Sequence, residues 1–217
     1  MSVHTSELKS EHTRIKRAAN RAVYERETVH AILDEAVVCH VGVIVDDRPI
    51  VIPTLHARVG DQLLLHGSPA SRMLRMAKTS EICVTVSLID GWVLARSALH
   101  HSVNYRSVTI VGRPEVVPKE EKVEMLDALM ERLTPGRNAH LRPMTDKEIK
   151  GTSLLRMPIT DAAAKVRTGP PIDDEEDYDL PIWAGVVPII TTLGPPETDP
   201  AMRMEVDIPD HVHTFRS

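Results

Sequence analysis

The stretch AVVCHVGVIVDDRPIVIPTLHARVGDQLLLH, residues 36–66, sets the architecture of the chain. It holds three apolar, strand-like runs, separated by the turn sequences DDRP and GD: 36–45, 50–59 and 62–66. Runs of this length that are rich in valine and isoleucine and joined by short polar turns are typical of β-hairpins. The stretch therefore predicts an antiparallel meander.

The same pattern continues along the chain. Further strand-like runs follow at 81–89, 92–100, 107–117 and 154–159, and Asp90-Gly91 is predicted to be a turn between the first two. Strands at this spacing indicate an antiparallel barrel or sandwich. We expect an α+β fold, with about six or seven antiparallel strands closing most of a barrel and peripheral helices outside it.

Three helices are predicted around these strands. The first has Thr28 as its N-cap, because apolar residues follow at helical spacing. The second covers about 70–78. The third covers about 118–133, is amphipathic, and stops before Pro135-Gly136.

The remaining segments predict the domain organisation. Residues 1–27 form a polar N-terminal arm, 28–195 the barrel domain, and 196–217 an irregular C-terminal tail. The N-terminus has no apolar core of a secretory signal, and no run of 18 apolar residues occurs. We therefore expect a cytoplasmic protein that does not bind a membrane.

The composition limits the classes of molecule that the protein is expected to bind. The net charge is −5 over 217 residues, and six aromatic residues are present. Nucleic-acid binding usually needs a basic face and stacking aromatics, so it is not expected. The two cysteines, Cys39 and Cys83, each lie in an apolar run, which argues against a disulfide framework. Small molecules and a second copy of the chain are the expected partners.

The sequence HGSPASRMLR, residues 66–75, lies between a predicted strand and a predicted helix. Small residues, the hydroxyls of Ser68 and Ser71 and the guanidinium of Arg72 at such a junction suit a bound phosphate. They equally suit a capped turn in which Ser68 is the N-cap and Arg72 points to water. The stretch alone leaves both interpretations open.

The sequence gives little support for a metal site, a nucleotide-binding motif or a serine-hydrolase motif. Eleven histidines invite a metal hypothesis, but His100 and His101 would point to opposite faces of a strand, and no zinc-type spacing occurs. GxGxxG, GxxxxGK[ST] and GxSxG are absent. The acidic run 173–179 is interpreted as a solvated loop. Polar residues concentrated in 96–107 indicate either a site or a wet dimer interface.

Five motifs together resemble one known family. They are CHVG (39–42), HGSPASRML (66–74), DGWVLARSALHHSVNYRSV (90–108), AAAKVRTGPPIDDEEDY (162–178) and LPIWAGVVP (180–188). They are similar to the pyridoxamine 5′-phosphate oxidase-like proteins with an FMN-binding split β-barrel. The branch that matches best is that of the flavin-nucleotide-binding proteins related to the 5-nitroimidazole reductases. The resemblance implies a homodimer with two flavin sites, each built by both chains.

The resemblance also implies site residues. Ser71 and Arg72, with Ser68 in the same loop, would bind the FMN phosphate, and His66 and Gly67 would flank the ring and ribityl chain. Ser107 would contact the flavin from the second subunit. A strand would run under the isoalloxazine and offer backbone groups to it: Ile52, Pro53, Thr54 and Leu55.

Two positions depart from the true oxidases. Met73 stands where they have a lysine, and Ile52 stands where they have an arginine in the strand that contacts the ring. With fewer cations and no evident substrate groove, the vitamin B6 oxidase reaction is not expected.

The leading hypothesis is an FMN-dependent oxidoreductase that acts on a small molecule and takes electrons from a separate donor. His101, Tyr105 and Arg106 are the candidate catalytic residues, chosen by residue type. The alternatives are a haem protein with iron bound through His66, a deazaflavin protein, or a non-catalytic flavin carrier or sensor. No other metal is expected.

Overall fold

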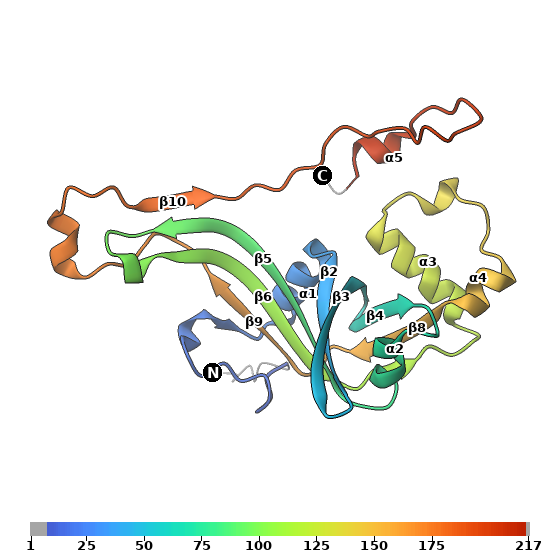
Figure 1. The fold of residues 1–217 in the computed structure, drawn as a ribbon, viewed down its shortest axis with the longest axis horizontal. Helices are drawn as coiled ribbons and strands as arrows, with labels where there is room; N and C mark the ends of the chain where they lie inside the picture. The colour runs from blue at the N-terminus through green and yellow to red at the C-terminus, as the bar shows by residue number, and fades with distance from the viewer. Residues whose placement is uncertain (1–7, 216–217) are drawn as a thin grey trace, which may run out of the picture.

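The computed structural model describes residues 8–215. In this part of the chain ten strands form one antiparallel sheet, accompanied by five α-helices (Figure 1). The strands are β1 Ala22–Val23, β2 Val38–Val45, β3 Arg48–Val59, β4 Gln62–Gly67, β5 Ile82–Leu94, β6 Ser102–Gly112, β7 Glu115–Val116, β8 Ser153–Pro158, β9 Ala162–Arg167 and β10 Gly185–Pro188. The helices are α1 Arg26–Glu35, α2 Arg72–Ala77, α3 Lys122–Leu133, α4 Asp146–Gly151 and α5 Asp210–His213.

The order of pairing is β1-β9-β6-β5-β2-β3-β4-β8-β7, with β10 on β5. The predicted meander is confirmed as β2, β3 and β4, which pair in sequence. In β2 the side chains alternate, because Cys39, Val41 and Val43 point into the main core while Val38 and Ile44 are exposed. The sheet therefore has an apolar inner face and an outer face that the chain does not fully cover.

A second, smaller core lies under α3. Leu126, Leu129 and Leu133 recur at helical spacing and pack against Leu64 of β4 and Leu154 of β8. The helix ends before Pro135-Gly136, as predicted. α3 thus covers the part of the sheet that adjoins the phosphate-site candidate.

The predicted Asp90-Gly91 turn is wrong. β5 runs without a break from Ile82 to Leu94, with a register shift against β6 between Ile89 and Gly91. Gly91 pairs with Asn104 on one side and Pro188 on the other, and a Cβ there would lie 2.9 Å from the carbonyl oxygen of Val187. The glycine permits close approach of β10 and does not make a turn. The predicted strand 92–100 accordingly ends at Leu94.

The first helix begins earlier than predicted. Its N-cap is Glu25, so Thr28 lies within the first turn and the prediction of Thr28 as N-cap is wrong. The Glu25 carbonyl accepts the first helical bond from Val29, at 3.2 Å, which the apolar pattern alone could not locate. Before this helix, Leu8 is buried and β1 pairs with β9. The described part of the N-terminal arm thus packs on the chain's own sheet.

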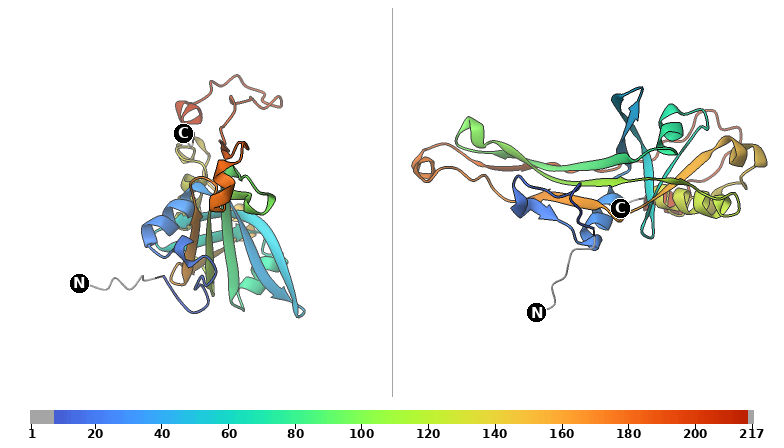
Figure 2. Two further views of the ribbon diagram at one scale, coloured as in Figure 1. Left: turned by 90° about the vertical axis from the view of Figure 1, so that its left-hand side faces the viewer. Right: turned by 90° about the horizontal axis from the view of Figure 1, so that it is seen from below.

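The C-terminal segment follows a separate course. After β10 the chain has no helix or strand until α5, and Figures 1 and 2 show it running along one side of the molecule, away from the N-terminal residues. Within residues 8–215, no helix has the length and apolar character needed to cross a membrane.

Candidate functional site

The junction after β4 is a tight turn followed by a short capped helix. The Ser68 hydroxyl accepts the N–H of Ala70 at 3.2 Å, and the Ser68 carbonyl accepts the N–H of Ser71 at 2.9 Å. Ser71 is the N-cap of α2, and its Oγ accepts the N–H of Leu74 at 3.4 Å. Capping therefore falls to Ser71, and Ser68 serves the turn before it.

Arg72 is exposed, and no hydrogen bond or ion pair to its guanidinium is found among residues 8–215. The hydroxyls of Ser68 and Ser71 lie in the same loop. An unpaired guanidinium beside hydroxyl groups can receive a phosphate through charge-assisted hydrogen bonds. The loop thus fits the group that the resemblance implies.

His66 lies at the end of β4, opposite Leu154 of β8. It is half-buried, and its Nδ1 is enclosed with no hydrogen-bond partner in the described chain. Burial lowers the pKa of the imidazole below its usual value of about 6.5, which favours the neutral ring. A neutral imidazole is the form that binds iron or zinc.

Ile52, Pro53, Thr54 and Leu55 lie on β3, on the strand next to His66. His56 of β3 pairs with Leu65 of β4. Leu55 and His66 are the next residues on these two antiparallel strands, so they lie beside the last pair. Ile52 and Thr54 are half-buried, whereas Pro53 and Leu55 are exposed. The structure therefore brings this strand and the 66–72 loop together on one part of the sheet.

The residues predicted on β6 lie elsewhere in the same chain. β5 and β2 separate β6 from β3, so three strand spacings, roughly 14 Å, divide the two groups. Ser107 pairs with Ser87 and with Lys165, and Tyr105 with Ile89 and Arg167. One copy of the chain does not unite the two groups in a single site.

Arg106 is bound by two carboxylates. Its Nη2 donates to Asp90 Oδ1 at 2.7 Å and to Glu35 Oε1 at 2.8 Å, and its Nε donates to Asp90 Oδ2 at 3.0 Å. These hydrogen bonds, to Glu35 first and then to Asp90, stabilise the charged guanidinium and raise the pKa of Arg106 further above its usual range. The side chain ties the end of α1 to the β5–β6 ladder, and Asp90 and Glu35 are partners that sequence patterns did not indicate.

His101 precedes β6, where its Nδ1 lies 2.8 Å from the carbonyl oxygen of Ser97. His100 ends a 3₁₀ turn of residues 98–100. The expectation that both histidines lie on a strand is therefore wrong, because β5 has already ended.

Among the described residues, ligand atoms of His100, Asp174 and Asp177 lie within 4.8 Å of one another. Such groups are common at surfaces without an ion.

The acidic run contains one buried carboxylate, so the interpretation of a fully solvated loop is wrong for Asp173. Its Oδ2 accepts Arg96 Nη1 at 2.9 Å, and its Oδ1 accepts the Arg96 backbone N–H at 3.0 Å. Burial acts to raise the pKa of Asp173, but the bonds from Arg96 outweigh it and the pKa is lowered. The Arg96 guanidinium also lies 4.8 Å from the ring of Tyr178. This cluster attaches the loop after β9 to the end of the β5–β6 ladder.

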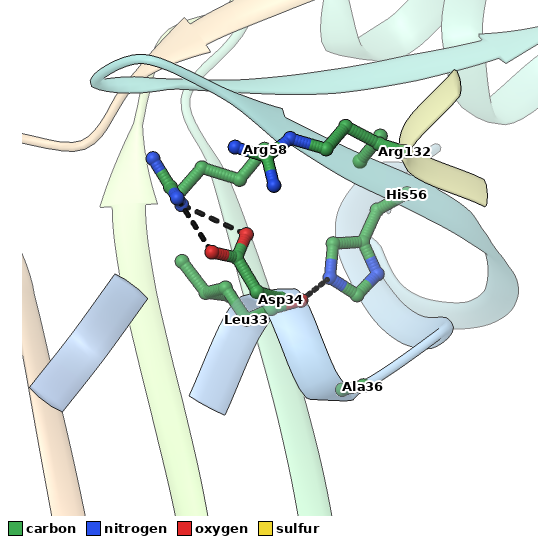
Figure 3. Close-up of a pocket in the computed structure, with 7 residues that line it drawn as sticks. Leu33, Asp34, Ala36, His56, Arg58 and Arg132 are labelled. Atoms are coloured by element: carbon green, nitrogen blue, oxygen red, sulfur yellow. Dashed lines mark hydrogen bonds and ion pairs between the residues drawn. The ribbon is translucent and has the colours of Figure 1, made fainter. Parts of the chain in front are cut away.

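Two hollows of the described chain bear on where a ligand could bind. The first, of about 40 Å³, lies between α1, β3 and α3 (Figure 3). There Arg58 Nε donates to Asp34 Oδ1 at 2.9 Å, and His56 Nε2 lies 3.1 Å from the Leu33 carbonyl oxygen. That volume suits water and not a flavin. The second, of about 310 Å³, is apolar and open, and is lined in part by Gly42, Ile44, Pro49, Val51 and Cys83.

Comparison with protein families gives one match. The sequence model of the family described as pyridoxamine 5′-phosphate oxidase matches residues 25–166, most of the chain. No curated protein sequence matches significantly.

Solved structures give closer likenesses. The flavocytochrome Anf3 from Azotobacter vinelandii is 44% identical, with a TM-score of 0.91 over 95% of this chain and 97% of its own. The FAD and heme binding protein from Mycobacterium smegmatis is 36% identical, with a TM-score of 0.87 over 90% of this chain and 97% of its own. A putative 5-nitroimidazole antibiotic resistance protein from Bacteroides thetaiotaomicron is 24% identical over 67% of this chain and 86% of its own, with a TM-score of 0.56, and shows the fold alone.

Proposed function

Because the chain belongs to the pyridoxamine 5′-phosphate oxidase-like family of split-barrel proteins, we propose that it is a flavin-binding oxidoreductase that also binds haem. One observation carries the proposal. The two relatives that match nearly the whole chain, at 44% and 36% identity, are a flavocytochrome and a protein that binds FAD and haem. The family resemblance implied FMN and the second relative binds FAD, so the proposal is for a flavin nucleotide of either kind.

Ser71 and Arg72 would hold the phosphate that FMN and FAD share. The free guanidinium of Arg72 supplies the charge, and the hydroxyls of Ser68 and Ser71 supply further hydrogen bonds. The strand from Ile52 to Leu55 would offer backbone groups to the ring. A bound flavin supplies the redox chemistry, and these residues would bind and orient it.

The second half of the site is proposed to come from a partner chain. The outer face of the sheet, defined here by Val38, Ile44, Val51, Leu55 and Ile89, exposes large apolar side chains on β2, β3 and β5. Large apolar side chains exposed on one face of a sheet are typical of an interaction site. A two-fold homodimer through this outer face would bring Ser107, His101 and Tyr105 of a second copy toward the flavin loop. Arg106 is the weakest catalytic candidate, since carboxylates already occupy it.

His66 is the proposed iron ligand. Its preference for the neutral form fits a metal-bound imidazole, and Nε2 would bind the iron, because Nδ1 is enclosed by the chain's own atoms. Haem would supply one-electron chemistry there.

The visible spectrum of the purified protein tests the cofactors. Bands near those of free flavin together with a Soret band are expected, and mass spectrometry of the released cofactor will distinguish FMN from FAD. Flavin bands without a Soret band would remove the haem part of the proposal. A colourless protein that takes up neither group would refute the whole of it.

Turnover tests the enzymatic part. A reduced nicotinamide would give up a hydride, and a nitroaromatic acceptor would receive the two electrons. Steady oxidation of the nicotinamide only when both acceptor and protein are present is the expected result. If no pair of electron donor and acceptor turns over the bound flavin, the protein is a flavin carrier and not an enzyme.

A further inference from the structure

His40 lies on β2 and points to the outer face of the sheet. It pairs with Pro53 of β3 and with Thr85 of β5. Val38 and Ile44, which help to define the outer face, lie on the same side of β2 as His40, because side chains alternate along a strand. Opposite residues of an antiparallel pair have Cβ atoms about 4.5–5.5 Å apart. His40 therefore adjoins Pro53, which belongs to the strand segment proposed to lie under the flavin ring.

The imidazole of His40 is exposed, and it makes no hydrogen bond or ion pair within residues 8–215. Other histidines of this part of the chain do have contacts: His56 lies against the Leu33 carbonyl, and His211 stacks on His140 with ring centroids 4.6 Å apart. The positions that adjoin His40 on the outer face carry no charged side chain: Val38, Gly42, Val51, Leu55, Cys83 and Ser87. A few polar groups on an otherwise apolar surface are typical of a small-molecule site, so this imidazole is available to a ligand.

His66 lies on the same face as His40, on the other side of β3. His56 and Leu65 are paired and buried, so the next residues along the two strands, Leu55 and His66, turn to the outer face. β3 lies between β2 and β4 in the sheet (Figure 1). Two strand spacings, roughly 10 Å, therefore separate the strand of His40 from that of His66. The segment from Ile52 to Leu55 thus has an imidazole on each side of it.

We propose that His40 donates a hydrogen bond to the polar edge of the flavin ring. This contact rests on the proposed function, in which the ring lies beside Ile52–Leu55 and His66 binds the iron. The carbonyl oxygens and nitrogens of a flavin ring accept hydrogen bonds, and a neutral imidazole supplies one N–H. A hydride from a reduced nicotinamide brings two electrons and one proton, and so leaves a negative charge on the ring. A donor at the polar edge then binds the reduced ring more tightly than the oxidised one. His40 would thus hold the ring and favour its reduction.

Titrations with FMN and with riboflavin test the contact, because riboflavin has the same ring and no phosphate. In the full-length, flavin-free protein, His40→Ala should raise the dissociation constants of both ligands by the same factor, about 2- to 12-fold, as expected for one neutral hydrogen bond. Arg72→Ala should weaken FMN alone. His40→Gln keeps an N–H donor and should recover part of the affinity. His12→Ala, an exposed histidine of the N-terminal segment, is the control and should change neither constant.

The reduction potential of the bound flavin gives the second readout. It should fall in His40→Ala and stay unchanged in His12→Ala, because only the first variant loses the donor at the ring. Unchanged affinities for both ligands in His40→Ala, or a loss for FMN alone, would overturn the contact. Loss of the Soret band with unchanged flavin binding would assign His40 to the haem and also overturn it. A wild-type protein that binds neither FMN nor riboflavin would refute the proposed function itself, a result that differs from a failure of His40 alone.

Discussion

Arg72 shows how much a single side chain contributes to the proposed site. It is the exposed cation of the loop after β4, and it has no partner within the described chain. Arg72→Ala should weaken flavin binding by about 1.5–3 kcal/mol, the usual worth of a hydrogen bond to a charged group. Titration of the cofactor-free protein, followed by quenching of flavin fluorescence, measures the change.

Arg75→Ala is the matched control, because Arg75 is an exposed arginine on the same helix. It should leave flavin affinity nearly unchanged. Equal losses in both variants would mean that general charge, and not the loop, attracts the phosphate. No loss in either would place the phosphate elsewhere.

His66 makes a separate prediction about haem. His66→Ala should remove the Soret band and keep the flavin bands, because the imidazole and not the phosphate loop would bind the iron. His213→Ala, an exposed histidine on α5, is the control and should keep both. Retention of the Soret band in the first variant would exclude His66 as a ligand.

Single residues also mark where sequence reasoning succeeded and failed. The strand–helix junction at residues 66–75 was predictable because small and hydroxyl-bearing residues follow an apolar run, although the N-cap is Ser71 and not Ser68, and the phosphate-binding role of Ser71 and Arg72 stays a prediction. The burial of Asp173 was not, because its partner Arg96 lies 77 positions away and no local pattern joins them. Pairings made only by the folded sheet leave no trace in a short stretch of sequence.

Among the secondary-structure elements, β10 depends on the absence of one side chain. A Cβ at Gly91 would lie 2.9 Å from the Val187 carbonyl oxygen, so Gly91→Ala should push β10 away from β5. The amides of Val186, Val187 and Ile189 should then exchange hydrogen at least tenfold faster, as measured by mass spectrometry. Gly151→Ala is the control, since a Cβ there meets nothing within 4 Å. Unchanged exchange in the Gly91 variant would show that β10 accommodates the added Cβ and stays paired with β5.

The attachment of α5 should depend on pH. Burial first, and then the charges of His140 and Arg137, lower the pKa of His211, while the charge of Glu131 acts in the opposite direction. Because the docked pKa lies below the free value of about 6.5, docking is complete above that pH and weakens as pH falls below it. Limited proteolysis of the C-terminal segment should therefore accelerate below about pH 6.5.

His211→Phe separates the charge from the stacking. The phenyl ring can still stack on His140 but cannot be protonated, so much of the acceleration at low pH should disappear. If the variant and the wild type respond to acid alike, another group controls the release.

Part of the secondary structure was predictable from the sequence, whereas β1, β9, β10, α4 and α5 were not predicted. The meander of β2, β3 and β4 and the helix α3 follow from apolar periodicity. The Asp90-Gly91 dipeptide has the composition of a turn, yet pairing with β6 on one side and β10 on the other holds it in a strand. Tertiary pairing overrode the local preference there.

For the whole molecule, cofactor binding and folding stability are linked. A ligand that binds only the folded chain stabilises it by about 2.7 kcal/mol at a concentration of 100 times its dissociation constant. For a chain of this size that corresponds to a rise of roughly 5–11 °C in Tm. Thermal unfolding of the cofactor-free protein with added FMN, FAD or riboflavin measures it. Riboflavin lacks the phosphate and should stabilise least, and an equal effect of all three would argue against a phosphate site.

The fold class and the family were accessible from the sequence because several motifs spread over the chain agree. The arrangement of the site was not, since the two groups of predicted residues lie on strands that β5 and β2 separate. Whether they meet depends on a second copy, and contacts between copies impose no spacing on a single sequence.

The pairing of β4 with β8 also determines when the chain can fold. β4 ends at Gly67 and β8 begins at Ser153, so the ribosome has to make all the intervening residues before the two strands can meet. At a synthesis rate of about 5–20 residues per second this takes roughly 4 to 17 s. Until then the apolar residues of β4, Leu63, Leu64 and Leu65, lack the strand that covers one edge. The nascent chain therefore carries an uncovered edge of β4 for most of the time that residues 68–152 are being made.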